Sequence, residues 1–197
     1  MKTNEYIIIH HSAVSRNKNS EQFDAINGYH KRKGWGQIGY HFLIEPSGKV
    51  KKGRPVTMVG AHCSQKLMNY RSIGICLAGH FDIEDPTEEQ KKALSKLLKE
   101  LQSTYGVLDN KIRLHREYAT YKSCPGNRIP NDILTYVKEA EIIPDWAKDG
   151  VKWAKKTKIS NCKNLNEPVT RMEMIVMHNY WDIVRETYWL ISYLFQV

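Results

Sequence analysis

Tyr6-Ile7-Ile8-Ile9-His10-His11 is a short apolar run that ends in two histidines, and it decides the fold. Its consecutive apolar positions predict a strand buried on both faces, as in the interior of a mixed or parallel sheet. Such sheets place functional sites beyond the carboxyl ends of their strands, which is where His10 stands. Because successive strand side chains point to opposite faces, we expect His11 to face away from His10.

Further strands are predicted along the chain. Residues 40–44 are a second apolar strand, and a Pro-Ser-Gly turn within 45–48 leads into a hairpin that resumes at 49–50. Residues 73–79 form a third apolar strand, and 112–114 a short one that ends just before His115. The pattern is that of a sheet with several buried strands.

Three helices are predicted between and after these strands. Ser20 can cap a helix over 21–32, and Thr87-Glu88-Glu89-Gln90 is a capping box that opens a second helix ending near Gly106. A third helix covers about 131–140. The apolar face of the second helix carries four leucines: Leu94, Leu97, Leu98 and Leu101. Strands flanked by helices predict an α/β domain with a mixed central β-sheet over residues 1–141.

Residues 142–197 have a different pattern of apolar and polar residues, which predicts a small helical appendage. Two short amphipathic helices are joined by a polar loop at 160–166. A helix–loop–helix of this size cannot bury a core alone, so it must dock on the first domain, on a second copy or on a ligand. The final apolar stretch, 188–197, is either an interface or a helix that covers the core.

Composition limits the class of protein. Hydrophobic residues make up 41% of the 197 residues, yet no run approaches the length of a membrane span. Residues 1–14 are too short and too interrupted for a signal peptide, so we expect synthesis in the cytoplasm. The cysteines lack the paired spacing of a C-x-x-C motif, so we expect thiols or metal ligands. They are Cys63, Cys76, Cys124 and Cys162.

The formal net charge of +9 indicates an anionic partner. Nucleic acid and an anionic polymer such as cell wall both fit this charge, and the charge alone does not choose between them. A nucleic-acid-binding protein would also show a recognisable module with stacking aromatics among its basic residues. The sequence shows no such module, so we expect no nucleic-acid partner.

His10, His115 and Cys124 are candidate metal ligands. His115 follows an apolar stretch, and Cys124 lies nine residues later in a loop rich in turn-forming residues. Two imidazoles and one thiolate suit a catalytic zinc, which keeps three protein ligands and leaves the fourth position to water. Histidine and cysteine separated by a loop also occur without any metal, so spacing alone leaves the site open.

Five motifs resemble the type-2 N-acetylmuramoyl-L-alanine amidases, a family that includes phage endolysins and catalytic peptidoglycan recognition proteins. They occur in the family's order and span roughly residues 6–140. They are Ile9-His10-His11-Ser12-Ala13, Gly34-Trp35-Gly36-Gln37-Ile38-Gly39-Tyr40-His41-Phe42, Gly60-Ala61-His62, Asn69-Tyr70-Arg71-Ser72-Ile73-Gly74-Ile75, and His115-Arg116-Glu117 with Cys124-Pro125-Gly126.

The resemblance implies a zinc enzyme that cuts the amide bond between N-acetylmuramic acid and L-alanine in bacterial peptidoglycan. By position, His10, His115 and Cys124 match the family's zinc ligands. Tyr40 matches the tyrosine that lies over the metal, and Lys122 matches the residue that faces the substrate carbonyl. One departure is that the family usually has eight residues from the second histidine to the cysteine, against nine here. We expect the extra residue to bulge within 118–121.

Substrate contacts are expected from His62, Asn69 and Trp35. His62 is either a plain loop histidine or a contact to the muramyl or peptide part of the substrate. Trp35 is either a core or groove-wall aromatic or a platform for a sugar. His41 alternates away from Tyr40 and is expected to be structural.

The tail resembles a single surface-layer-homology repeat, in Pro144-Asp145-Trp146-Ala147, Val151-Lys152-Trp153-Ala154 and Pro168-Val169-Thr170-Arg171-Met172-Glu173. Such repeats bind secondary cell-wall polymers, usually as sets of three. One repeat therefore implies wall binding with partner chains, or a different role such as homo-oligomerisation.

Two functional alternatives remain. A peptidoglycan recognition module that only binds would lack the metal, and its usual mark is loss of the cysteine ligand, whereas Cys124 is present. A phage lysis enzyme and a cellular autolysin share the same motifs. The compact layout without a signal peptide favours a phage enzyme that acts on the wall after its release from the cytoplasm.

Overall fold

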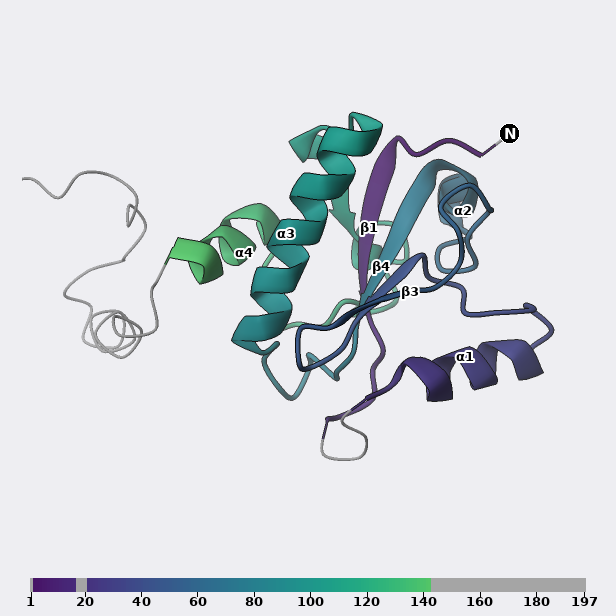
Figure 1. Cartoon of the computed structure of the whole chain (residues 1–197), viewed down its shortest axis with the longest axis horizontal. Coiled ribbons are helices and arrows are strands. Elements are labelled where there is room, and N and C mark those ends of the chain that lie inside the picture. The colour runs from purple at the N-terminus through teal and green to yellow at the C-terminus, as the bar shows by residue number, and fades with distance from the viewer. Residues whose placement is uncertain (1, 17–20, 143–197) are drawn as a thin grey trace, which may run out of the picture. The chain divides into compact units, whose positions relative to one another are not determined.

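The computed structural model of the chain describes residues 2–16 and 21–142 (Figure 1). It contains a five-stranded mixed sheet with the strand order β3-β2-β4-β1-β5. The strands are β1 (Tyr6–His11), β2 (Phe42–Ile44), β3 (Val50–Lys52), β4 (Ser72–Leu77) and β5 (Ile112–Leu114). The helices are α1 (Phe23–Arg32), α2 (Met68–Arg71), α3 (Glu88–Tyr105) and α4 (Ile133–Ile142). Single 3-10 turns cover Gln65–Leu67, Asp109–Lys111 and His115–Glu117. The predicted α/β class with a mixed central sheet is confirmed.

β1 and β4 form the middle of the sheet. β1 is parallel to β4 on one side and to β5 on the other, and β4 is parallel to β2. Only β3 is antiparallel, as the return strand of the predicted hairpin. All six residues of β4 are buried, which explains its unbroken apolar run. The parallel pairing brings the carboxyl ends of β1, β4 and β5 to one edge of the sheet.

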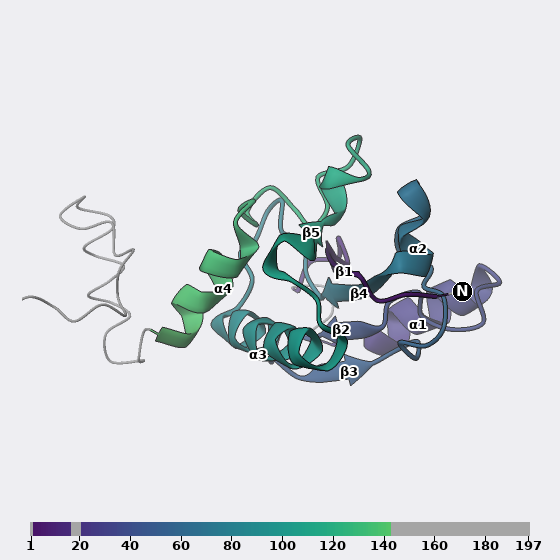
Figure 2. The ribbon, with the colours of Figure 1, turned by 90° about the horizontal axis from the view of Figure 1, so that it is seen from above.

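The two faces of the sheet are covered differently. α3 and α4 lie side by side (Figures 1 and 2) and share one core with the apolar residues of one face. On the other face, Phe23 and Ile26 of α1 pack against Leu43 and Cys76. In the β1–β4 register His10 pairs with Cys76, so the ring of His10 lies on the α1 face. That face holds the candidate site.

The caps of the two long helices show what local sequence predicts. Thr87 accepts from the Gln90 N–H and α3 ends at Gly106 in the left-handed region, as expected. Ser20 lies outside the described residues, and α1 begins after Gln22 without a side-chain cap on its own helix. Instead, the carboxylate of Glu45 accepts the backbone N–H groups of Gln22 and Phe23, both at 2.9 Å. Glu45, the residue after β2, thus caps the N-terminus of α1.

Several predicted boundaries differ from the structure. β2 begins at Phe42 and not at Tyr40, although the His41 N–H still donates to the Gly74 carbonyl of β4 at 2.9 Å. β4 ends at Leu77, two residues before Gly79, whose φ of 153° carries the chain towards a turn. α2 and the 3-10 turns were not predicted.

The predicted tail, with its two helices, its final apolar stretch and Cys162, lies outside the described residues. In the part of the chain that the structure describes, Cys63, Cys76 and Cys124 are free thiols, as expected. No helix within 2–16 and 21–142 combines the length and the apolar character needed to cross a membrane.

Candidate active site

His10, His115 and Cys124 converge at the carboxyl ends of two neighbouring strands. His10 is the second-last residue of β1, and His115 directly follows β5. One ligand atom from each of the three residues lies within 4.8 Å of the other two. His10 Nδ1 is 3.8 Å from Cys124 Sγ, and the His10 and His115 ring centroids are 4.4 Å apart. All three side chains are buried.

The loop that carries Cys124 is fastened by Arg116. The Arg116 N–H donates to the Cys124 carbonyl at 2.7 Å. Its guanidinium donates to the carbonyls of Gly126 (2.9 Å) and Ile129 (2.7 Å) and to the Asn131 side chain (2.8 Å). The sequence analysis quoted Arg116 as part of a motif and gave it no role. Its role is to hold Cys124 beside the two histidines.

Two successive turns fold the chain between His115 and Cys124. The His115 carbonyl accepts the N–H groups of Tyr118 and Ala119, and the Ala119 carbonyl accepts the Lys122 N–H. Tyr121, inside the expected bulge, is 75% exposed. This folding brings the charge of Lys122 close enough to act on all three candidate ligands.

The protonation states of the three residues fit a metal site. Burial, and after it nearby positive charge that includes Lys122, lowers the pKa of His10 well below 6.5 and the pKa of His115 to about 4. Both rings are therefore neutral at pH 7, the form that ligates a metal. Burial raises the pKa of the Cys124 thiol to about 11, so a bound cation would be needed to hold it as a thiolate.

One buried atom of this group has no hydrogen-bond partner among the described residues. It is Nδ1 of His115, and an orphaned buried nitrogen is costly unless something outside the chain satisfies it. Two imidazoles and a thiol are also the donors that zinc prefers. The residues present therefore fit a zinc ion.

Comparison with known proteins shows the family of this chain. The family described as N-acetylmuramoyl-L-alanine amidase matches residues 1–127. This chain belongs to the N-acetylmuramoyl-L-alanine amidase family.

Relatives in two groups of organisms support this membership. The endolysin of Enterobacteria phage K11 is 36% identical over 123 residues, covering 60% of this chain and 76% of the endolysin. Peptidoglycan-recognition protein SC2 of Drosophila melanogaster is 32% identical over 136 residues, covering 66% of this chain and 73% of that protein. Among solved structures, the N-acetylmuramoyl-L-alanine amidase LysC from Clostridium intestinale has a TM-score of 0.61 and 30% identity, covering 70% of this chain and 87% of that one.

Tyr40 of this amidase-family chain lies near two of the three candidate ligands, His10 and Cys124. Its ring centroid is 5.2 Å from that of His10. Burial raises the pKa of the Tyr40 hydroxyl well above 10, and the neighbouring Cys76 and Cys124 add to this effect. The phenol therefore stays protonated and offers an O–H donor at neutral pH.

The three expected substrate contacts lie in different surroundings. Trp35 is 39% exposed and stacks on His30 with centroids 4.6 Å apart. It borders a pocket of roughly 530 Å³ next to α1, together with Asn27 and Lys52. Asn69 Oδ1 accepts the N–H groups of His62 and Cys63, both at 2.8 Å, so it organises the loop that carries His62. The His62 ring reaches His10 itself, at 3.0 Å.

His11, His80 and Asp82 form a second group of potential ligands that the sequence analysis missed. Nδ1 of His11 accepts the Phe81 N–H at 3.2 Å, so the neutral ring keeps its proton on Nε2 and has no free lone pair for a metal. The Asp82 carboxylate accepts the Asn127 N–H and the Ser123 hydroxyl, both at 2.8 Å. The group is therefore better explained as a support that ties the loop after β4 to the Cys124 loop.

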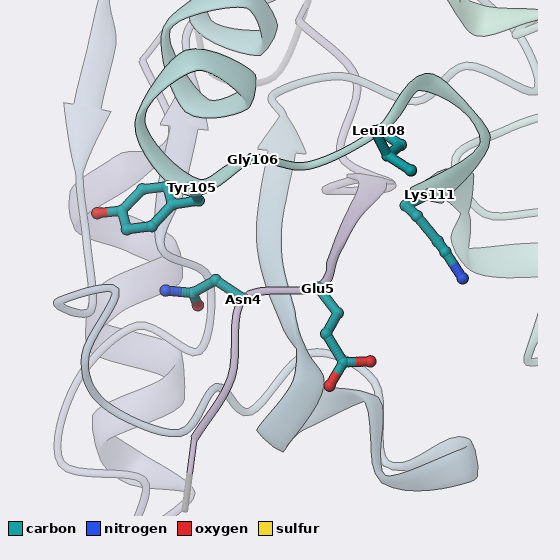
Figure 3. Close-up of a pocket in the computed structure, with 6 residues that line it drawn as sticks. All are labelled: Asn4, Glu5, Tyr105, Gly106, Leu108 and Lys111. Atoms are coloured by element: carbon teal, nitrogen blue, oxygen red, sulfur yellow. The ribbon is translucent and has the colours of Figure 1, made fainter.

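A separate pocket of roughly 490 Å³ lies at the opposite end of β1 (Figure 3). Asn4 and Glu5, which precede β1, line it together with residues that follow α3. The lining residues are Asn4, Glu5, Tyr105, Gly106, Leu108 and Lys111. It contains no cysteine or histidine, and it is remote from His10 because β1 separates the two. It is not part of the candidate active site.

Proposed function

We propose that this protein hydrolyses the amide bond between N-acetylmuramic acid and L-alanine in bacterial peptidoglycan, and that it needs zinc to do so. The observation that carries the proposal is the convergence of His10, His115 and Cys124, together with the buried Nδ1 of His115, which makes no hydrogen bond within the described residues. Membership of the amidase family supports the reaction, and the names of its relatives, endolysins and peptidoglycan-recognition proteins, support the substrate.

In this proposal His10, His115 and Cys124 hold the zinc. When bound, zinc supplies Lewis acidity, which lowers the pKa of a water molecule and polarises the amide carbonyl. The buried, neutral imidazoles suit this task because neither carries a proton on both nitrogens at pH 7. Arg116 keeps the thiol of Cys124 in place by hydrogen-bonding to the carbonyls of Cys124 and Gly126.

Lys122 and Tyr40 act on the substrate. The ammonium of Lys122 stabilises the negative charge that develops on the carbonyl oxygen, which is the usual role of a donor at this point of acyl transfer. Tyr40 stays protonated, so it orients the attacking water or gives a proton to the leaving amine; it is not the general base. Trp35, with the pocket beside α1, offers a wall for the glycan or the peptide.

A non-catalytic peptidoglycan recognition module is the second candidate. Relatives named as recognition proteins share 32% identity with this chain, so recognition without hydrolysis is a real alternative. The presence of Cys124 in contact distance of His10 favours catalysis, because a protein that only binds has no need of a buried thiol there.

A pair of cysteine variants tests the function. Cys124→Ser should lose most of its bound zinc and nearly all release of L-alanyl peptide from a soluble muropeptide. Cys63→Ser is the matched control, because Cys63 is also a buried thiol but its Sγ contacts Gln65 and not the candidate ligands. The control should keep zinc and activity. Full zinc content and full activity in Cys124→Ser would show that the ligand assignment is wrong, and a zinc-loaded parent without hydrolysis would favour the recognition module.

The proposal extends to where the protein works. Synthesis in the cytoplasm followed by release onto the wall is the mode of action expected of a phage lysis enzyme, and relatives from phages K11, T3 and T7 are named endolysins. A cellular autolysin would act on the wall of its own growing host. Adding the purified protein to permeabilised bacteria and to isolated walls separates activity on the wall from any role inside the cell.

A further inference from the structure

His62 is packed against His10 on the side away from Cys124. Nδ1 of His62 lies 3.0 Å from Nε2 of His10, and the two rings meet edge to face with centroids 5.0 Å apart. The other nitrogen of His62, Nε2, is buried, and the backbone of Ser72 lies close enough to interact with this ring. His10 thus engages one ring nitrogen of His62, and the other is shielded from solvent. Little hydrogen-bonding capacity of the ring is then left for a substrate.

The positions of the two His10 nitrogens determine the direction of this hydrogen bond. Nδ1 of His10 faces Cys124 Sγ at 3.8 Å, so it is the nitrogen available to a metal shared with the thiol. A neutral imidazole with its Nδ1 lone pair committed to a metal carries its proton on Nε2. Among the described residues, the acceptor within hydrogen-bond distance of that proton is Nδ1 of His62.

The surrounding backbone is shaped to hold the His62 ring. A Cβ on Gly74, in the middle of β4, would lie 2.5 Å from Cδ2 of His62, and a Cβ on Gly60 would lie at the same distance. Glycine in a buried strand weakens it, and is used where another group approaches the backbone closely. Asn69 in addition accepts the backbone N–H of His62 at 2.8 Å, which helps to fix the ring in place.

We propose that His62 is a positioning residue that fixes the tautomer and the orientation of His10. This inference rests on the proposed zinc site. Metal-bound histidines usually donate their second N–H to a carboxylate, a carbonyl or a water, and loss of that partner typically lowers metal affinity about 10- to 100-fold. Here the partner is a second imidazole. In this proposal His62 does not bind substrate as expected. It accepts a hydrogen bond from the candidate ligand His10 and does not contact the metal itself.

Two variants of equal shape test the proposal. His62→Asn keeps an acceptor oxygen where Nδ1 stands, and His62→Leu places a methyl group there. Zinc affinity, measured by competition with a chelator, should fall about 10- to 100-fold in His62→Leu and stay within a few-fold of the parent in His62→Asn. The visible absorption of Co²⁺ bound in place of zinc should change in the leucine variant only. Urea unfolding of the metal-free proteins should be similar for the two variants, since both remove the same ring.

Each result has a distinct meaning. If the parent chain takes up no zinc, the proposed metal site fails and the positioning role fails with it. If the parent binds zinc and His62→Leu binds it equally tightly, or if both variants lose affinity alike, only the positioning role is overturned. Should His62→Leu not fold, Gly74→Ala displaces the ring while keeping His62, and unchanged zinc affinity in that variant would contradict the proposal.

Discussion

At the scale of single residues, the chemistry depends on which groups are charged at the reaction centre. Burial keeps His10, His115 and Tyr40 neutral at pH 7. In the proposed mechanism the positive charge near the substrate carbonyl therefore comes from Lys122. Its ammonium also lies 5.5 Å from the centre of the Tyr121 ring, a contact that helps to define the position of a flexible side chain. Lys122 is therefore expected to affect turnover and not metal binding.

Replacing Lys122 with alanine tests this division of roles. We expect Lys122→Ala to lower the rate of muropeptide hydrolysis by about 100- to 1000-fold, the usual loss when an oxyanion donor is removed. Its zinc content should stay equal to that of the parent, as measured by elemental analysis of the dialysed protein. Lys111→Ala is a suitable control, because Lys111 lines the remote pocket and contacts Tyr6. A near-parental rate in Lys122→Ala would mean that the longer loop carries this lysine away from the substrate.

At the scale of secondary-structure elements, β4 is held to the β2 side of the sheet by a side chain as well as by the backbone. His41 stands just before β2, and its N–H donates to the Gly74 carbonyl at 2.9 Å. In return the Gly74 N–H donates to Nδ1 of His41 at 2.8 Å, and Nε2 of His41 faces the Met58 carbonyl at 3.2 Å. His41 is 1% exposed. The expected structural role is consistent with these bonds, and it makes the pairing of these elements sensitive to acid.

The pH dependence of stability should reveal this histidine. Burial, with a smaller effect of Lys2, lowers the pKa of His41 from 6.5 to about 4 in the folded protein. Between pH 6.5 and pH 4, His41 binds a proton in the unfolded chain but not in the folded chain. The free energy of unfolding therefore falls as the pH is lowered from 6.5 to 4. One such histidine contributes a slope of about 1.4 kcal/mol per pH unit in this range.

His41→Asn should remove that slope. Its Oδ1 can still accept the Gly74 N–H, but the amide does not titrate. We expect the curve of unfolding free energy against pH, from urea melts with a chelator present, to be flatter by about 1.4 kcal/mol per pH unit between pH 4 and 6.5. Parallel curves for variant and parent would show that His41 is protonated in the folded state too.

The elements also show what could be predicted from the sequence. Apolar runs identified β1 and β4, and the capping box and Gly106 gave the ends of α3, because these signals lie within a few neighbouring residues. The helical region at 65–71 was missed because Lys66 and Leu67 adopt left-handed backbone angles that neither residue type predicts. The cap of α1 was missed because it comes from Glu45, and the His10–His62 contact because it joins residues 52 positions apart. The candidate ligands were found because strand ends and family motifs mark them locally.

At the scale of the whole molecule, the candidate active site lies within one domain. The residues assigned to it run from His10 to Cys124, inside the family match of 1–127. The domain does not end there, however. Ile133 and Val137 of α4 are 3% and 1% exposed, and they belong to the same core as the leucines of α3. A catalytic domain must therefore keep α4.

Shortening the chain after Ile142 tests this division and the role of the tail. Every candidate catalytic residue and the whole α3–α4 core are kept, so the shortened protein should fold, bind zinc and hydrolyse a soluble muropeptide at the parental rate. We expect the loss to appear elsewhere: weaker co-sedimentation with intact walls if the tail binds a secondary wall polymer, or a change from oligomer to monomer in light scattering if it joins copies of the chain. A cut before Ile133 is the control, because it removes α4 and its core residues Ile133 and Val137 and should unfold the domain. If the longer fragment is folded and zinc-loaded yet inactive on the small substrate, the tail contributes to the active site and the two-domain division is wrong.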